Sequence, residues 1–179
     1  MAVTQKTVLR MAVSAECPTH ARTSAQAGRH EIVIDEPTAR GGTDLGATPI
    51  ETMIASLLGC TNVILNRVAE KNNVEVKVLA LEAEASFDRR GVMLEEEIAV
   101  PFPEIRLTIN LTTPATDSQV QRLKSDLGKF CPVSKVHPSV RNQIGRGLEH
   151  HACVMFKETI EEKAGDDRDR RPHPLRGDL

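Results

Sequence analysis

One long amphipathic segment, residues 48–71, constrains the fold more than any other part of the chain. Thr48 is placed as a helix N-cap, Pro49 suits the first helical position, and Glu51 follows the cap by three residues, as in a capping box. Apolar residues then recur at helical spacing until a pair of asparagines begins at Asn72. The apolar stripe is wide and small residues occupy the other faces, so we expect a helix that is buried on more than one side.

Segments with the alternation typical of β-strands stand on both sides of this helix. The predicted strands are residues 9–14, 32–34, 74–87, 105–111 and 153–160. Between the first two lies a polar stretch of small residues, 17–28, which we interpret as a loop or a wide hairpin. In the third strand the phase of the apolar positions slips by one at Val78 and Leu79, which predicts a β-bulge.

A second helix is predicted to begin at Thr116 or Asp117, with four apolar side chains facing inward. These are Val120, Leu123, Leu127 and Phe130. The elements together indicate one α+β domain over residues 1–163, with strands first, then a buried helix, a β-meander and another helix. Residues 164–179 are charged, contain proline and lack a core pattern, so we expect a disordered tail.

Composition narrows the class of function. The formal net charge of −2 and the pI near 6.3 argue against a nucleic-acid-binding module, and the absence of Trp and Tyr offers little for base stacking. Residues 1–8 contain no continuous apolar stretch, and no apolar run approaches the roughly 18 residues of a membrane span. We therefore expect a cytoplasmic protein in which the four cysteines are normally reduced and any disulfide is transient.

Two of these cysteines are candidates for chemistry. Cys60 lies in the middle of the predicted long helix, where the ordinary alternative is a small buried apolar side chain. Cys131 directly precedes Pro132, which places it as the N-cap of a short helical segment, residues 132–137. A thiol at that position faces the positive end of the helix, which favours the thiolate form. The alternative is a cysteine that merely fills a turn.

The order and spacing of several short motifs resemble those of the OsmC/Ohr family (osmotically inducible, organic hydroperoxide resistance). The motifs are Asp35-Glu36-Pro37, Gly41-Gly42, Thr48-Pro49-Ile50-Glu51, Leu57-Leu58-Gly59-Cys60, Asp88-Arg89-Arg90-Gly91 and Cys131-Pro132-Val133-Ser134-Lys135. The resemblance covers about residues 6–160. It implies an OsmC-like α+β fold of antiparallel sheets wrapped around a long central helix, in an intertwined homodimer with active sites where the subunits meet.

The resemblance also implies a chemistry for the two cysteines. The cysteine matching Cys60 attacks the O–O bond of an organic hydroperoxide and becomes a sulfenic acid. The cysteine matching Cys131 condenses with it to a disulfide, which an external thiol reductant then reduces. No metal and no organic cofactor is implied, and no nucleic acid or membrane partner is expected.

The resemblance further implies an arginine that holds the thiolate and a carboxylate that orients the arginine. Arg22 matches the arginine best, with Arg29 second. In the peroxidase branch the glutamate directly follows the proline, ten residues before the cysteine, whereas Glu51 is nine residues before Cys60. Nine steps of about 100° place Glu51 on the opposite helix face from Cys60. Glu51 is thus a candidate catalytic residue that the capping box explains better, and the offset is typical of the broader OsmC-like branch.

Two other functions stay open at the level of the sequence. One is a non-catalytic or small-molecule-binding OsmC-like protein in which the thiols are structural, which the offset of Glu51 favours. The other is a zinc site built from Cys17 and His20 together with the run His150-His151-Ala152-Cys153. Exposed loop histidines and spare thiols are the simpler interpretation of that second group.

Overall fold

The computed structural model describes residues 7–136 and, for backbone only, residues 140–147. The strands are β1 (Ser14–Glu16), β2 (Thr23–Ala27), β3 (His30–Ile34), β4 (Val78–Ser86), β5 (Glu104–Thr112) and β6 (Val140–Gly147). The helices are η1 (Thr38–Arg40), α1 (Pro49–Lys71), α2 (Asp117–Phe130) and α3 (Pro132–Val136). The predicted strand at 153–160 and the tail at 164–179 lie outside the described residues.

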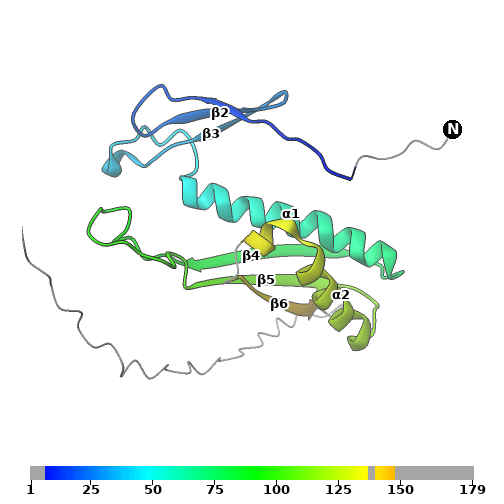
Figure 1. Ribbon diagram of the computed structural model, residues 1–179. Helices are drawn as coiled ribbons and strands as arrows, with labels where there is room; N and C mark the ends of the chain where they lie inside the picture. The colour runs from blue at the N-terminus through cyan, green and yellow to red at the C-terminus, as the bar shows by residue number, and fades with distance from the viewer. Residues whose placement is uncertain (1–6, 137–139, 148–179) are drawn as a thin grey trace, which may run out of the picture.

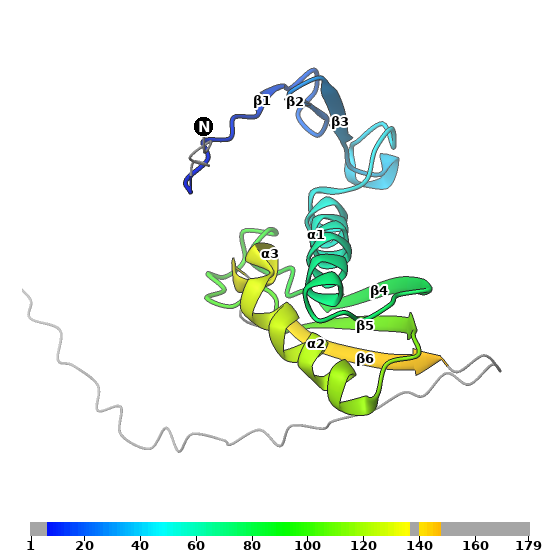
Figure 2. The same ribbon diagram turned by 90° about the vertical axis from the view of Figure 1, so that its right-hand side faces the viewer.

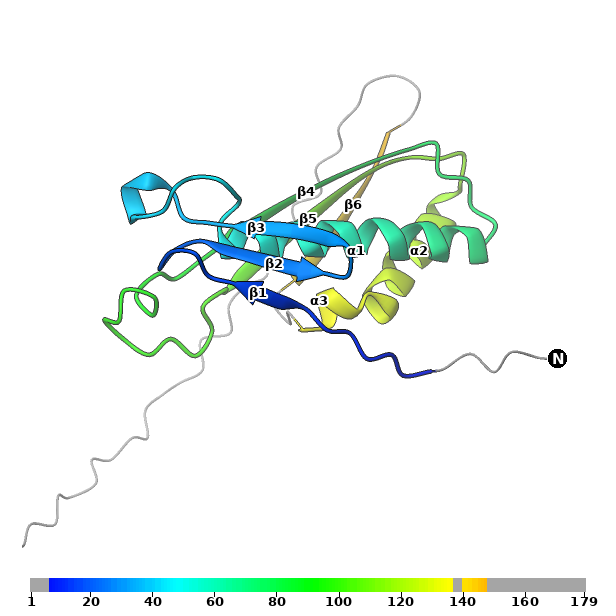
Figure 3. The same ribbon diagram turned by 90° about the horizontal axis from the view of Figure 1, so that it is seen from above.

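The elements form two three-stranded sheets with α1 between them (Figure 1). One sheet has the order β4-β5-β6, and α1 and α2 lie on the same face of it (Figure 2). The other sheet has the order β1-β2-β3 and stands on the opposite side of α1, away from α2 and α3. Seen from above, β2 and β3 run over α1 (Figure 3). The predicted α+β architecture around a long helix is confirmed.

The long helix begins and ends where the sequence predicts. The Glu51 N–H donates to Thr48 Oγ1 at 3.3 Å, and the Thr48 N–H donates to Glu51 Oε2 at 2.8 Å, so the capping box is complete. At the other end, Asn72 is the C-cap and Asn73 has a φ of 53°. One face of α1 is buried against the rest of the core. Its buried residues are Leu57, Thr61, Leu65, Val68 and Ala69.

The core lies between the β4-β5-β6 sheet and the two helices. Four alternate side chains of β5 are almost completely buried, as their alternation predicts: Ile105, Leu107, Ile109 and Leu111. Leu123 and Leu127 of α2 pack in the same core. Phe130 was predicted to face inward, but 52% of it is exposed and its ring lies 5.6 Å from the Lys71 ammonium nitrogen. Phe130 is the last residue of α2, and the core continues beyond it through Cys131, so position in the chain does not explain its exposure.

Four features of the strands differ from the prediction. The first strand, predicted at residues 9–14, is β1 and begins only at Ser14. The segment 17–28, interpreted as a loop or a wide hairpin, contains a strand of its own, β2, which pairs with β3 through a two-residue turn that begins at Gly28 with a φ of 62°. β4 pairs with β5 without interruption from Val78 to Ser86, so the phase slip marks the start of the strand and not a bulge. β6 was not predicted at all, and it pairs with β5 in parallel, so that sheet is mixed and not antiparallel throughout.

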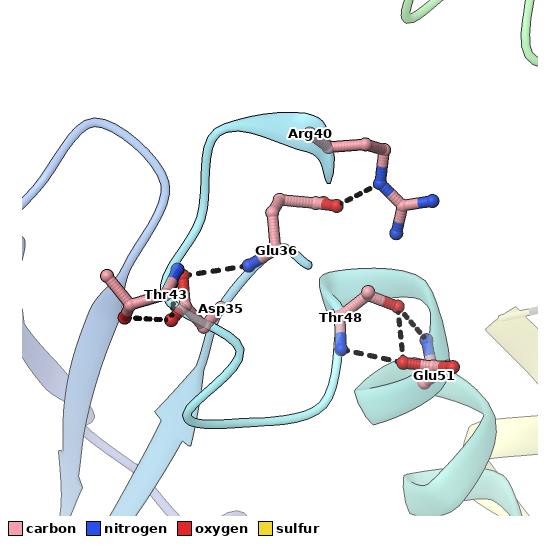
Figure 4. Close-up of polar contacts among 6 residues, drawn as sticks. All are labelled: Asp35, Glu36, Arg40, Thr43, Thr48 and Glu51. Carbon is pink, nitrogen blue, oxygen red and sulfur yellow. Dashed lines mark hydrogen bonds and ion pairs between the residues drawn. The ribbon is translucent and has the colours of Figure 1, made fainter. Parts of the chain in front are cut away.

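The loop from β3 to α1 is held by one buried carboxylate. Asp35 accepts a hydrogen bond from the N–H of Glu36 at 2.8 Å (Figure 4). It also accepts from the N–H groups of Thr43 at 3.1 Å and Leu45 at 3.2 Å. The Thr43 hydroxyl also donates to Asp35, and this bond above all holds the pKa of Asp35 below its usual range. The loop therefore has a fixed path into the first turn of α1.

Candidate active site

Two cysteines that lie 71 positions apart in sequence meet in the structure. Cys60 is in the middle of α1, and Cys131 lies between the end of α2 and the start of α3. The Cys131 thiol donates to Cys60 Sγ, with the two sulfurs 3.4 Å apart. Cys131 is completely buried, whereas Cys60 is partly buried. Only small side-chain movements separate this arrangement from a disulfide.

The proline after Cys131 explains how that thiol is oriented. Cys131 has an extended backbone with φ −74° and ψ 107°, and its N–H still donates to Leu127 O at 2.9 Å at the end of α2. Pro132 then begins α3, so Cys131 stands as the predicted N-cap. The Ser134 N–H donates to Cys131 Sγ at 3.5 Å, and the Ser134 hydroxyl donates to Cys131 O at 3.1 Å.

The first turn of α3 therefore gives one backbone N–H to each sulfur. Ser134 serves Cys131, and the N–H of Val133 forms a hydrogen bond with Cys60. Neither amide was predicted as part of the site. Their signal is present in the sequence, because Pro at the first helical position leaves the next two N–H groups as the first free donors of the helix.

Burial raises the pKa of the Cys60 thiol, and the neighbouring Cys131 raises it further, while the hydrogen bond from Val133 opposes the shift. Within one chain, the site thus holds its thiols in close contact but supplies little that would ionise Cys60.

Glu51 does not join this site in the same chain. It lies in the first turn of α1, nine residues before Cys60. At about 1.5 Å per residue, the two residues are about 13.5 Å apart along the helix axis. Its carboxylate accepts from the N–H and the hydroxyl of Thr48, each at 2.8 Å (Figure 4). These bonds, with the nearby Arg40, lower the pKa of Glu51. The interpretation of Glu51 as a capping residue is confirmed.

Both candidate arginines lie next to strands of the β1-β2-β3 sheet, at the two ends of β2. Arg22 directly precedes β2, and its backbone N–H donates to Thr19 Oγ1 at 2.9 Å. Arg29 lies in the turn before β3, where its Nε donates to His30 Nε2 at 3.4 Å. Across the described part of the chain, no hydrogen bond or ion pair joins either arginine to Cys60 or Cys131. This sheet also stands away from α3 in two views (Figures 1 and 2).

The predicted zinc site is only half within the described residues. Cys17 is exposed, with its Sγ 3.9 Å from Thr23 Oγ1. The imidazole of His20 lies beside Gly41. Residues 150–153, the other half of the predicted ligand set, lie outside the described residues. Over residues 7–136 there is no group of three His, Cys, Asp or Glu side chains placed to hold a metal ion.

A family model for OsmC-like proteins matches residues 41–141, which include both cysteines. Solved structures share the fold. The chain is similar to an OsmC-like protein from Mycoplasma pneumoniae, at 15% identity and a TM-score of 0.64, over 79% of this chain and 99% of that one. At such low identity the likeness shows the fold alone.

Two further similar structures are described as organic hydroperoxide resistance proteins. The one from Legionella pneumophila has 13% identity and a TM-score of 0.56, over 80% of this chain and all of that one (100%). The one from Elizabethkingia anophelis has 18% identity and a TM-score of 0.58, over 79% of this chain and 98% of that one. No curated protein matches the chain by sequence.

Proposed function

Because this chain belongs to the OsmC family of OsmC-like proteins, we propose that it is a thiol-dependent peroxidase that reduces organic hydroperoxides in defence against oxidative stress. The proposed reaction takes place in the cytoplasm, uses an external thiol as reductant, and needs neither a metal nor an organic cofactor. Nucleic acid and membrane have no part in it. The observation that carries the proposal is the 3.4 Å separation of Cys60 Sγ and Cys131 Sγ.

The proposed reaction has two steps. The Cys60 thiolate attacks the terminal oxygen of the hydroperoxide, the O–O bond breaks, and the alkoxide leaves as an alcohol after it takes up a proton. The resulting sulfenic acid is then attacked by the Cys131 sulfur, which forms the disulfide and releases water. Because Cys131 is already within 3.4 Å, the second step can precede further oxidation of Cys60.

The proposal requires a positive charge at Cys60, because burial holds the pKa of that thiol high in a single chain. We propose that Arg22 of a second copy supplies it, in a homodimer. The β1-β2-β3 sheet supports this assembly, since Ala25 is the one buried apolar side chain in its three described strands. The segment before β1 also exposes Val8, Leu9 and Met11, the last at 93%.

The test of this function measures the consumption of cumene hydroperoxide by the full chain with dithiothreitol as reductant. Cys60→Ser should abolish turnover, and Cys131→Ser should allow at most a single oxidation before Cys60 is overoxidised. Cys17→Ser is the matched control, because Cys17 is a free cysteine outside the pair. Turnover by Cys60→Ser at the wild-type rate would refute the mechanism.

One observation favours a second candidate, a non-catalytic or small-molecule-binding protein with structural thiols. The raised pKa of Cys60 is the opposite of what activates a nucleophilic cysteine. In that case, iodoacetamide at neutral pH should modify Cys17 and leave Cys60 untouched in the native protein. A peroxidase with Arg22 beside Cys60 should instead show rapid alkylation of Cys60, which Arg22→Ala slows.

A further inference from the structure

The two sulfurs of the candidate pair are not equally accessible, and this asymmetry bears on how an oxidised protein would be reduced. Cys131 is completely buried by its own chain, between α2, α3 and the sheet core. Cys60 is only partly buried. A second copy packed against this region could cover Cys60 further, but it could not expose Cys131. That Cys60 is more accessible than Cys131 is therefore already determined within the single chain.

From this geometry we propose that the external thiol attacks the Cys60 sulfur of the disulfide and that Cys131 is the leaving thiolate. The inference rests on the proposed function, because it concerns the disulfide which that function forms. The reductant belongs to the class of small mono- or dithiols, which can approach a partly exposed sulfur. Attack on a disulfide depends on access to the sulfur and on the stability of the thiolate that leaves.

The hydrogen bonds around Cys131 favour its departure as the thiolate when the disulfide breaks. The Ser134 N–H donates to its sulfur at 3.5 Å, and such a donor stabilises negative charge that develops as the disulfide breaks. The Ser134 hydroxyl donates to the Cys131 carbonyl at 3.1 Å, which holds the backbone of the leaving residue in place.

The steps balance without any further reactant. A thiolate RS⁻ attacks Cys60 Sγ, the Cys60–Cys131 bond breaks, and the products are the mixed disulfide Cys60–S–S–R and the Cys131 thiolate, which takes up a proton. A second thiolate, from another molecule or from the same dithiol, then attacks the R sulfur. This releases RSSR and Cys60 as a thiolate. Two external thiols are oxidised to one disulfide, and the protein disulfide is reduced to two thiols.

The experiment maps which cysteine carries the mixed disulfide. The full-length protein is oxidised with diamide, so that the test does not depend on peroxide chemistry, and is then mixed with glutathione. Acid stops the exchange in the first turnovers because it protonates the thiolates. Free thiols are blocked with maleimide and the peptides are analysed by mass spectrometry. We expect glutathione on the Cys60 peptide and maleimide on the Cys131 peptide, in an excess of at least about tenfold over the reverse.

The same disulfide-linked protein unfolded in urea is the matched control, since neither sulfur is then buried. There the two peptides should carry glutathione in comparable amounts. A bias toward Cys131 in the folded protein, or the same distribution folded and unfolded, would overturn this inference while leaving the peroxidase proposal intact. Failure of diamide to form a Cys60–Cys131 disulfide would overturn both. A protein that forms the disulfide with diamide but ignores cumene hydroperoxide would refute only the proposed function.

Discussion

Oxidation of the Cys60–Cys131 pair should stabilise the protein strongly against unfolding. The sulfurs are 3.4 Å apart before any bond forms, so the crosslink should introduce little strain. Because the cysteines are 71 positions apart, the disulfide closes a long loop in the unfolded chain. In the chain-entropy model, a loop of about 70 residues removes about 15 cal/mol/K from the unfolded state, or about 4 kcal/mol at 25 °C.

Urea denaturation measures this gain directly. With a slope of about 2 kcal/mol/M, a gain of about 4 kcal/mol should raise the unfolding midpoint by about 2 M. Diamide-oxidised protein is compared with the same sample after reduction, at one fixed protein concentration, since a dimer would make the midpoint depend on concentration. Cys131→Ser, treated identically, should show no difference between the two conditions.

Two results would contradict this reasoning. If the disulfide forms but the midpoint does not rise, the native arrangement must be strained by the bond, which is inconsistent with sulfurs that already touch. If Cys131→Ser gains as much stability as the wild type, another pair of cysteines forms the crosslink. In that case the contact between Cys60 and Cys131 would not be the redox-active one.

Three further predictions concern the loop and the helices that position the site. Thr48→Ala should destabilise the protein by about 0.5–2 kcal/mol in urea denaturation, because it removes the cap of α1, whereas Thr48→Ser should cost much less. In Gly42→Ala the new Cβ would clash with the backbone carbonyl of Glu36 and force the loop to move, which lowers Tm. Gly128→Ala in α2 meets no atom within 4 Å and should instead gain about 0.5–1 kcal/mol. The pKa of Asp35 is lowered in the folded state, so its contribution is present above the unfolded value of about 3.9 and is lost as pH falls through the folded value. Tm should therefore fall less between neutral pH and pH 3 in Asp35→Asn than in the wild type, and an equal fall in both proteins would contradict this.

The sequence predicts those elements whose signals are local. The capping box and the asparagine pair give both ends of α1, and clean alternation gives all four buried positions of β5. β2 was missed because its residues, Thr23 to Ala27, are small and polar, and it exists through pairing with β1 and β3. A short strand of this kind depends on its neighbours and not on its own propensity.

In the candidate site, too, some features follow from local sequence signals and others depend on tertiary contacts. The N-cap position of Cys131 follows from one proline, and the wrong phase of Glu51 follows from counting residues along a helix. The contact between two sulfurs 71 positions apart depends on how α2 crosses α1, and no local pattern encodes that crossing. Only the resemblance of the motifs to a known family linked the two cysteines before the structure did.

The two cysteines and the two candidate arginines lie in different parts of the chain, and this separation supports the proposed homodimer. Both thiols, the two amides of α3 and the burial around them come from residues 60–134 of one chain. Arg22 and Arg29 flank β2, in the β1-β2-β3 sheet region. That sheet has one buried apolar side chain in its described strands, and it lies on the far side of α1 from the β4-β5-β6 sheet (Figure 1). A buried thiol without a nearby cation stays protonated, and a sheet without a core is unstable alone. In the proposed homodimer, a second copy would cover this sheet and bring its Arg22 to Cys60. Arg22→Ala and substitutions that prevent dimerisation should therefore slow the alkylation of Cys60 to the same extent.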